Sequence, residues 1–548
     1  MSLTRSADVP DGTRLDTGIC IVGGGPIGIT VALQLEGAGI DVTVLESGGS
    51  DGETAEHRAL NEGAVVGLPY YDLTETRMRG LGGASNLWAG WCRPIDRIDL
   101  ERRDWFPTTG WPISYDELEP FLIEAARLCE LDGIMADVPP DRLPPMYRPP
   151  FVGGDVEVAL WQGSPPTKFW DVYGGRLRRS RNVAVYTDAT ATEILTAPDG
   201  GAVTGVRVAG PDGRTFVVRA GTVVLAAGAI ETARLLLASN AARPAGLGNE
   251  YDLVGRHFME HPHLVTARLR VLAPTGRATL PAVDRGLTGA RARLAMQRPA
   301  GGVKVAYVVA EGRKRAEHLL NFSTHLRTVS PVSREDSDAY EAFKLLVTNL
   351  RSPGETWRQV RSGAVPEGLG RLLGRIVRGL PDVFQIVYHE ALRRPRRLAL
   401  YTQSEQVPNP DSRVTVDPRD RDRHGVPRVR LQWRLSRLDK ETVIRSQAIV
   451  GERLQEAGLG VLEPEPAFRD DGPDWGPNLR GGHHHMGTAR MATDPRHGVV
   501  DPDGKVHSVE GLFVGDAAVF PTGGYANPMQ TSVAFAVRLG RHLRRHVT

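Results

Sequence analysis

The sequence predicts an α/β fold that opens with a Rossmann-like unit and continues into a second domain built on a mainly antiparallel sheet. Residues 17–22 form an apolar, β-branched run, which is typical of a buried parallel strand. Residues 27–35 have the pattern of an amphipathic helix, and residues 41–45 form a second strand that ends at Glu46. Three glycines at G-x-G-x-x-G spacing join the first strand to the helix: Gly23, Gly25 and Gly28. This order predicts a βαβ unit that binds a dinucleotide.

Each part of this unit has a physical role in binding a pyrophosphate. The glycines allow a tight turn, a close approach of the phosphates and close packing of helix on strand, while the helix N-terminus attracts the phosphate charge. Glu46 follows Gly28 by 18 positions and can accept hydrogen bonds from ribose hydroxyls, whereas its charge would repel a 2′-phosphate. A turn-rich βαβ unit without a ligand is the alternative interpretation.

Two later apolar runs indicate that the chain returns to the first sheet. Residues 222–228 form one such strand, and residues 511–517 form another that ends in Gly-Asp. A nicotinamide enzyme needs neither return, whereas two-domain flavoproteins return to the nucleotide domain in this way. Asp516 could then meet the ribityl chain. The two returns favour FAD over NAD.

Alternating patterns between these returns predict the second domain. Residues 264–272 and 303–309 fit strands of a sheet with one covered face. Residues 336–393 have the pattern of several helices, with leucines at helical spacing that we expect to pack in a core. We predict an FAD-binding domain and a substrate-binding domain with the following segments: 1–110, 181–255 and 475–548 for the first, and 111–180 and 256–474, including the helical insertion, for the second.

Composition excludes several classes of protein. A chain of 548 residues is too long for one core, and a net charge of +2 does not indicate a polyanionic partner. We interpret the arginine runs at residues 393–397 and 541–545 as solvated surface. Residues 1–6 lack the apolar part of a signal peptide, and no apolar run approaches the roughly 20 residues of a membrane span. We expect a cytoplasmic protein without nucleic-acid or membrane partners.

Six motifs, in the order in which they occur, resemble the glucose-methanol-choline (GMC) oxidoreductases. Residues 82–88 and 111–115 are similar to the corresponding motifs of one branch of this family, which contains pyranose 2-oxidase and bacterial C-glycoside oxidases. The motifs are the three glycines with Glu46, residues 79–88 (RGLGGASNLW), 227–232 (AGAIET), 257–262 (HFMEHP), 484–488 (HHMGT) and 525–528 (YANP). The resemblance implies an FAD domain assembled from separated segments, with the sheet of a substrate domain covering the flavin ring.

The resemblance also assigns cofactor contacts beyond the first glycines. Leu87 stands where pyranose 2-oxidase has a histidine tethered to the flavin, and since leucine cannot form that bond, the FAD is expected to be non-covalent. Ala191 would meet the adenine through its backbone, and Asp516 the ribityl chain. The further implied cofactor contacts are Gly82, Gly83, Asn86, Asn527 and Pro528.

Alcohol oxidation needs a group that removes the hydroxyl proton while hydride passes to flavin N5. An imidazole suits this task because it titrates near neutral pH. The residues alone do not choose among the three histidines at 483–485, but the resemblance selects His484, three positions before a Gly-Thr pair, with Asn527 as its partner. Asn527 and Pro528 also fit the N-cap and first position of a helix over residues 529–543, whose positive end would face the flavin. The alternative is that Asn527 only caps this helix.

The remaining polar candidates have plainer interpretations. His257, His261, His263 and the histidines at 483–485 lack a nearby acid or cysteine to complete a zinc site, so we expect no metal. His261 and Pro262 are interpreted as a crossover between the domains. Gln403 and Gln406 could hydrogen-bond substrate hydroxyls or, equally, satisfy strand ends.

The sequence therefore predicts an FAD-dependent oxidoreductase that converts a primary or secondary hydroxyl of a sugar, glycoside or cyclitol to a carbonyl. Oxygen or another electron acceptor would complete the cycle. The alternatives are a non-sugar alcohol as substrate, a non-redox lyase on the same fold, and a protein that holds FAD without turnover. The substrate, the oxidised carbon, the electron acceptor and the oligomeric state stay open.

Overall fold

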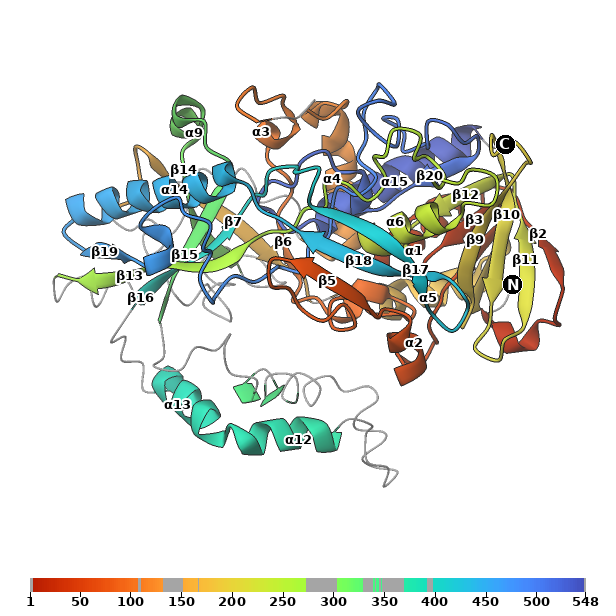
Figure 1. The fold of residues 1–548 in the computed structure, drawn as a ribbon, viewed down its shortest axis with the longest axis horizontal. Coiled ribbons are helices and arrows are strands. Elements are labelled where there is room, and N and C mark those ends of the chain that lie inside the picture. The colour runs from red at the N-terminus through yellow and green to blue at the C-terminus, as the bar shows by residue number, and fades with distance from the viewer. Residues whose placement is uncertain are drawn as a thin grey trace.

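The computed structural model describes most of the chain. Figure 1 shows a parallel sheet at one end of the molecule, where both termini lie, and an antiparallel sheet at the other end. The described residues are 3–106, 110–131, 151–165, 167–272, 303–328, 339–340, 342–343, 346, 369–391 and 398–546.

A six-stranded parallel sheet brings together the two ends of the chain and its middle. Its strand order is β1-β8-β4-β3-β12-β20, and every pairing is parallel. The strands are β1 (Leu3–Arg5), β3 (Ile19–Val22), β4 (Val42–Leu45), β8 (Val183–Thr187), β12 (Thr222–Leu225) and β20 (Leu512–Val514). This arrangement confirms the Rossmann-like α/β fold, including both predicted returns of the chain.

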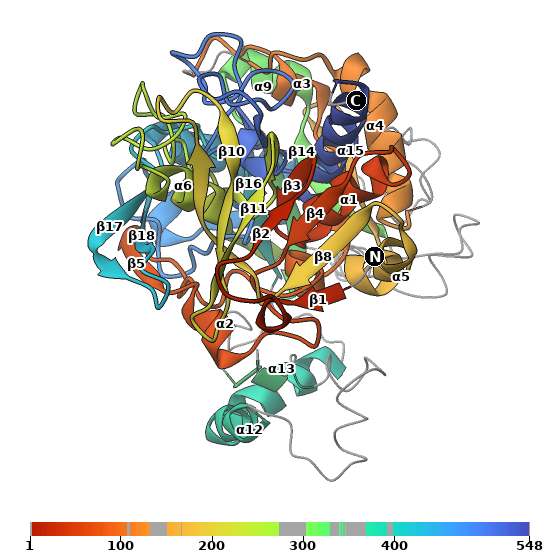
Figure 2. The ribbon, with the colours of Figure 1, turned by 90° about the vertical axis from the view of Figure 1, so that its right-hand side faces the viewer.

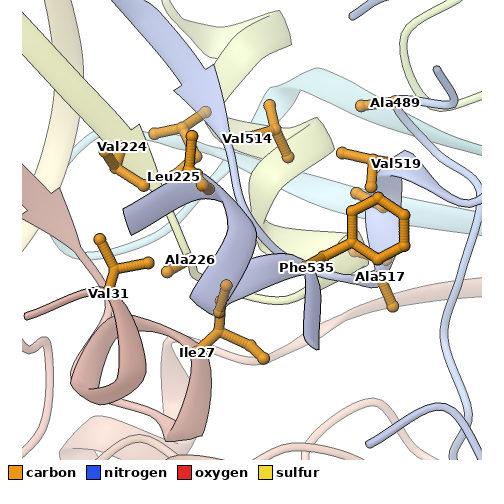
Figure 3. Packing of buried hydrophobic residues seen from close by; sticks show 14 of the residues in the cluster. Ile27, Val31, Val224, Leu225, Ala226, Ala489, Val514, Ala517, Val519 and Phe535 are labelled. Carbon is orange, nitrogen blue, oxygen red and sulfur yellow. The ribbon is translucent and has the colours of Figure 1, made fainter. Parts of the chain in front are cut away.

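Helices cover this sheet because its central strands are apolar on both faces. All residues of β3, β4 and β12 are buried, and a fully buried Val, Leu or Ile side chain contributes about 1.5–3 kcal/mol. Figure 3 shows Ile27 and Phe535, from two different helices, in one cluster with Val224 and Val514 of the sheet. The surrounding helices are α1 (Pro26–Leu35), α4 (Tyr115–Leu128), α5 (Phe169–Arg179), α6 (Ala229–Ala238) and α15 (Met529–His546).

Two smaller sheets flank the parallel sheet. One has the order β2-β11-β10-β9, and in the other β5 joins the β17–β18 hairpin as a parallel strand. Their strands are β2 (Arg14–Asp16), β9 (Thr190–Thr196), β10 (Val203–Ala209), β11 (Thr215–Arg219), β5 (Gly63–Gly67), β17 (Arg413–Arg421) and β18 (Pro427–Trp433).

A seven-stranded antiparallel sheet with the order β19-β13-β16-β15-β14-β7-β6 forms the other end. One face packs its apolar residues against α14 (Arg437–Glu456), while the opposite face carries Trp161 and Ala306 next to Tyr525. The strands are β6 (Trp91–Cys92), β7 (Val156–Gly163), β13 (His263–Val271), β14 (Val303–Val309), β15 (Phe322–Thr328), β16 (Leu398–Ser404) and β19 (Gly460–Pro464). The predicted strands at 264–272 and 303–309 correspond to β13 and β14.

The remaining helices are short or lie outside the two ends. In Figures 1 and 2, α12 (Leu369–Arg378) and α13 (Leu380–Ala391) lie below the sheets, within the predicted insertion at 336–393, most of which falls outside the described residues. Leu373 and Val377 of the expected apolar core are exposed, whereas Ile376 is buried, so the prediction of core packing is wrong for the first two. The division into two domains stays a prediction. The other helices are α2 (Ala55–Ala59), α3 (Arg97–Leu100) and α9 (Glu311–Glu317).

Candidate active site

His484 and Asn527 lie side by side, although 43 positions separate them in the chain. The amide Nδ2 of Asn527 lies 3.0 Å from Nε2 of His484. On its other side, Oδ1 of Asn527 accepts a hydrogen bond of 2.9 Å from Nε1–H of Trp161 on β7. The two ends of one amide group therefore connect the His484 loop to the antiparallel sheet.

The side chain of Asn527 does not cap the following helix, in contrast to the sequence interpretation. Helix α15 begins at Met529, and the carbonyl of Pro528 accepts a helical hydrogen bond of 2.8 Å from the N–H of Ser532. Pro528 is thus the capping residue rather than the first helical residue. Because the Asn527 amide is engaged by Trp161 and His484, the prediction that it only caps the helix is wrong.

His484 is part of a series of hydrogen-bonded side chains, and the bonds at the two ends of this series determine the tautomer of its ring. Trp161 Nε1–H can only donate, so Oδ1 of Asn527 accepts, and Nδ2 must donate to Nε2 of His484. At the other end, the carbonyl of Gly523 accepts from Nε2–H of His261 at 3.3 Å. His261 Nδ1 is then an acceptor, and His484 Nδ1–H donates to it at 2.8 Å. Both ends leave His484 Nε2 without a proton, which is the form that a base requires.

Burial favours the same neutral form. Desolvation is the main reason why the pKa of His484 lies well below its usual value, and the neighbouring histidines, His261 first, lower it further. The pKa of His261 falls to about 4, again chiefly through burial. Both rings are therefore neutral at physiological pH.

A buried glutamate holds the loop that carries His484. Oε1 of Glu260 accepts from the backbone N–H of His484 at 3.0 Å, and Oε2 accepts from Gly482 at 2.8 Å and His261 at 3.0 Å. The hydroxyl of Tyr70 donates to Oε1 as well. Burial raises the pKa of Glu260 to about 7 against the effect of these donors. The carboxylate thus fixes the backbone at Gly482 and at His484 itself.

The adjacent histidines have other contacts. The ring of His483 stacks on Tyr71, with centroids 4.3 Å apart, and His483 adopts a left-handed backbone with φ of 58°. His485 Nε2–H donates to the hydroxyl of Tyr70 at 2.9 Å. Of the three, His484 is the one that faces Asn527, which agrees with the choice that the resemblance makes.

The glycine turn at the other end of the chain is sterically restricted. Gly23 has φ of 113°, and a Cβ on Gly28 would lie 1.9 Å from the carbonyl oxygen of Gly23. The turn at Gly82 and Gly83 packs onto it, since a Cβ on Gly83 would lie 3.0 Å from Cα of Gly25. The two glycine motifs therefore meet at the N-terminus of α1, whose first N–H groups have no partner within the helix.

One acid, Glu46, lies close to this turn. Glu46 accepts backbone N–H groups from Gly24 and Gly48 at 2.8 Å and from Gly80 at 2.9 Å. A carboxylate has about four acceptor positions, so one remains for a ribose hydroxyl. Burial raises the pKa of Glu46, and the three N–H donors act against this shift.

Comparison with protein families fits this geometry. Residues 18–305, more than half of the chain, match the model of the FAD dependent oxidoreductases, and residues 408–536 match the model named GMC oxidoreductase. The chain belongs to the GMC family of FAD-dependent oxidoreductases.

Relatives of this GMC protein include both full-length and partial matches. A 2-methyl-1,2-propanediol dehydrogenase of Mycolicibacterium austroafricanum is 24% identical over 610 residues, covering 99% of this chain and 96% of the relative. A C-glycoside 3-oxidase of Arthrobacter globiformis is 35% identical over 146 residues, or 25% of each chain. The solved structure of a formate oxidase of Aspergillus oryzae RIB40 superposes with a TM-score of 0.55 at 18% identity, over 98% of this chain and 99% of that one, which shows a common fold.

The described residues fit the FAD that the family binds. The open N-terminus of α1 suits the pyrophosphate, and Glu46 retains an acceptor for the ribose. Asp516 accepts hydrogen bonds from Gly228, Thr232 and Ala518, which leaves its carboxylate one further acceptor position for a hydroxyl. Three other predicted cofactor contacts lie elsewhere. Ala191 lies on β9, and Asn86, in the short turn after Gly82, donates to the carbonyl of Leu81. Leu87 follows Asn86 in the chain and is 58% exposed.

The side chains of Gln403 and Gln406 form hydrogen bonds within the protein. Gln406 is buried and donates to the carbonyls of Phe258 and Arg434, while its Oε1 accepts from Glu260 N–H and Trp433 Nε1–H at 3.0 Å each. Gln403 donates to the carbonyl of Tyr525 at 2.6 Å. The structure favours the interpretation that both satisfy backbone groups, and Gln406 has no polar atom left for a substrate.

Sequence reasoning missed three residues that organise the site. Glu260 and His261 lie in the quoted HFMEHP motif, so a signal existed, but it was interpreted as a domain crossover. Trp161 gave no signal, because its contact with Asn527 depends on how β7 pairs within the sheet. In the described part of the chain, no helix is long and apolar enough to span a bilayer, and no three His, Cys, Asp or Glu side chains are grouped to hold a metal ion.

Proposed function

We propose that the chain oxidises a primary or secondary hydroxyl of a sugar, glycoside or cyclitol to the carbonyl, with His484 as the base. One observation carries this proposal: hydrogen bonds from both directions leave Nε2 of His484 unprotonated beside the amide of Asn527. A base in this form is ready to accept a hydroxyl proton.

The residues of the chain have distinct tasks in this proposal. FAD, when bound, supplies the acceptor for the hydride that leaves the substrate carbon. When substrate binds, its hydroxyl replaces Asn527 as the donor to His484 Nε2, which takes the hydroxyl proton, and the released Nδ2 of Asn527 donates to the hydroxyl oxygen and orients it. Glu260 keeps the His484 backbone in place during turnover. Oxygen or another electron acceptor takes the electrons at the end of the cycle.

The flavin is proposed to be bound without a covalent link. Leu87 stands at the position where the sequence resemblance expects a tethering histidine, and its side chain has no nucleophilic atom. Precipitation of the purified yellow protein with acid should leave the flavin in the supernatant. Yellow colour that stays with the precipitate after washing would contradict this point.

Two substrate classes have specific support. The name of the C-glycoside 3-oxidase, which is 35% identical over part of the chain, favours a glycoside. The name of the full-length relative, a 2-methyl-1,2-propanediol dehydrogenase, supports a small non-sugar diol as the second candidate. The two candidates share the chemistry at His484 and differ in what the rest of the pocket contacts.

Anaerobic mixing with a panel of sugars, glycosides, cyclitols and diols tests the proposal. A substrate should bleach the flavin absorbance, and mass spectrometry should find a product with two hydrogen atoms fewer. A compound that is consumed without bleaching would indicate a lyase instead. A panel in which no compound bleaches a flavin-loaded protein would overturn the proposed oxidation.

A further inference from the structure

Basic side chains line the face of the antiparallel sheet that adjoins His484 and Asn527. Lys304 on β14 pairs in register with Trp161 on β7, and His325 on β15 pairs with Tyr401 on β16. Since paired residues share a face, these four side chains lie on one side of the sheet. The side is that of the active site, because Trp161 donates to Asn527.

Ring contacts make this face continuous with the active site. The ammonium of Lys304 lies 5.6 Å from the centroid of the Trp161 ring, and Trp161 and His325 are 6.1 Å apart. Arg327 lies 3.6 Å above the ring of Tyr401, whose hydroxyl is 3.1 Å from Nδ1 of His263. The ring of His263 is in turn 6.0 Å from that of His484.

The ammonium of Lys304 has no hydrogen-bond or ion-pair partner among the described residues, and its contact is the Trp161 ring. Burial lowers the pKa of Lys304 to about 7, and the positive charge of Arg327 adds to this effect. Lys304 is partly buried, and lysines that are removed from water are normally paired with an anion. A cation–π contact alone offsets only part of this desolvation.

The neighbouring histidines give a second indication. Burial is the main cause that lowers the pKa of His263 and of His325, and the charges of Lys304 and Arg327 lower both further. Both rings are thus neutral, in a region whose fixed charges are positive. Nε2 of His263 is buried and lacks a hydrogen-bond partner within the described ranges. The face offers positive charge and polar atoms to a ligand. The carboxylates that share it, Glu157 on β7 and Glu463 on β19, are exposed, and neither pairs with Lys304.

We propose that Lys304 binds an anionic group, with a carboxylate as the first candidate, on the substrate whose hydroxyl contacts His484 and Asn527. This inference rests on the proposed function and narrows it to uronic acids and their glycosides. Trp161 contacts both Lys304 and Asn527, so the anion site and the reacting hydroxyl are about one indole ring apart, which a single sugar ring can span.

Matched probes test the anion site on the FAD-loaded protein. The probes are D-glucuronate and D-galacturonate, with D-glucose and D-galactose as neutral partners and glucose 6-phosphate as a second kind of anion. Anaerobic bleaching gives the half-saturating concentration of each probe, and calorimetric titration gives binding whether or not the flavin is bleached. The wild-type protein should bind at least one anionic probe about tenfold or more tightly than its neutral partner, and the anion that binds identifies a carboxylate or a phosphate.

Substitutions of Lys304 test whether this side chain causes the preference for an anionic probe. Lys304→Met should weaken binding of the anionic probe about tenfold or more and change binding of the neutral sugar less than about twofold, while Lys304→Arg should keep most of the preference. Lys168→Met, the same change at an exposed lysine before α5, is the control. FAD content and melting temperature confirm that each variant is folded.

Three results would overturn the anion site: equal binding of neutral and anionic probes, no saturable binding of any anion, or a preference that survives Lys304→Met in a folded protein. A failure of the proposed function is seen separately. In that case no hydroxyl compound bleaches the flavin, although calorimetry still decides whether Lys304 binds an anion.

Discussion

His484 is a neutral imidazole whose Nε2 accepts from Asn527 and whose Nδ1–H donates to His261. Its lowered pKa has a definite consequence for activity, because the unprotonated base persists below the usual titration range of histidine. We predict that protonation of His484 lowers kcat/KM only well below pH 6.5, whereas protonation of Glu260, whose pKa is about 7, gives a separate acid limb that is absent from Glu260→Gln. Comparison of the pH–rate profiles of the wild-type protein and Glu260→Gln measures this. An acid limb at or above 6.5 that persists in Glu260→Gln would show that the base is another group.

Removal of the imidazole should affect the chemistry and not the cofactor. A general base contributes about 10²–10⁴-fold, so His484→Ala should slow anaerobic bleaching by at least a hundredfold with FAD content unchanged. His483→Ala is a matched control, since that ring stacks on Tyr71 instead of facing Asn527. A loss of less than about tenfold, or about 1.4 kcal/mol of barrier, would exclude His484 as the base.

At the scale of elements, the turn between β3 and α1 has no space for a side chain at one position. A Cβ on Gly28 would overlap the carbonyl of Gly23 at 1.9 Å, so Gly28→Ala must displace the start of α1. We predict loss of bound FAD, measured as the ratio of absorbance at the flavin band to that at the protein band. Gly221→Ala, where a Cβ meets nothing within 4 Å, should keep full FAD content. Equal FAD content in both variants would contradict the role of this turn.

The loop of His484 depends on the acceptor capacity of Glu260. Glu260→Gln leaves one side-chain oxygen to accept hydrogen bonds from the four donors around it. Each buried donor that loses its partner destabilises the protein by about 1–3 kcal/mol. We expect kcat to fall at least about tenfold with KM and FAD content retained, because the base is displaced while the pocket remains. Glu463→Gln, in an exposed pair with Arg270, serves as the control. An unchanged kcat would show that the loop holds its position without the carboxylate.

Local patterns predicted the elements that depend on neighbouring residues. The glycine turn, β14 and the start of α15 all follow from spacing and periodicity within a few positions, and the structure has them close to where they were expected. Trp161, Lys304 and Arg327 could not be predicted as parts of the site, because their positions follow from the register of β7, β14 and β15. Register arises from packing across strands, which no local sequence pattern reports.

At the scale of the whole molecule, one buried ion pair connects segments that we predict to belong to different domains. Arg103 binds both carboxylate oxygens of Glu405, at 2.8 and 2.5 Å, and the two side chains are 1% and 0% exposed. Glu405 also accepts the backbone N–H of Asn321 at 2.9 Å. The pair therefore joins the segment after α3 to the loop after β16.

Breaking this pair should destabilise the protein strongly. Arg103→Met leaves a buried carboxylate without its cation, and such changes cost about 3–5 kcal/mol. Arg270→Met, which removes an exposed partner of Glu463, should have little effect. Thermal unfolding of the FAD-loaded variants provides the comparison. Equal melting temperatures for the two variants would show that Glu405 is stabilised without Arg103.

The neighbouring strands β3, β12 and β20 come from residues 19–22, 222–225 and 512–514. During translation, β3 therefore leaves the ribosome about 490 residues before the edge strand of its own sheet is made. A nascent chain that has exposed its glycine turn still lacks β20, α15 and Asp516, a proposed cofactor contact. With the proposed contacts, stable flavin insertion waits until the C-terminal segment has emerged, and the early apolar strands have to be shielded until then.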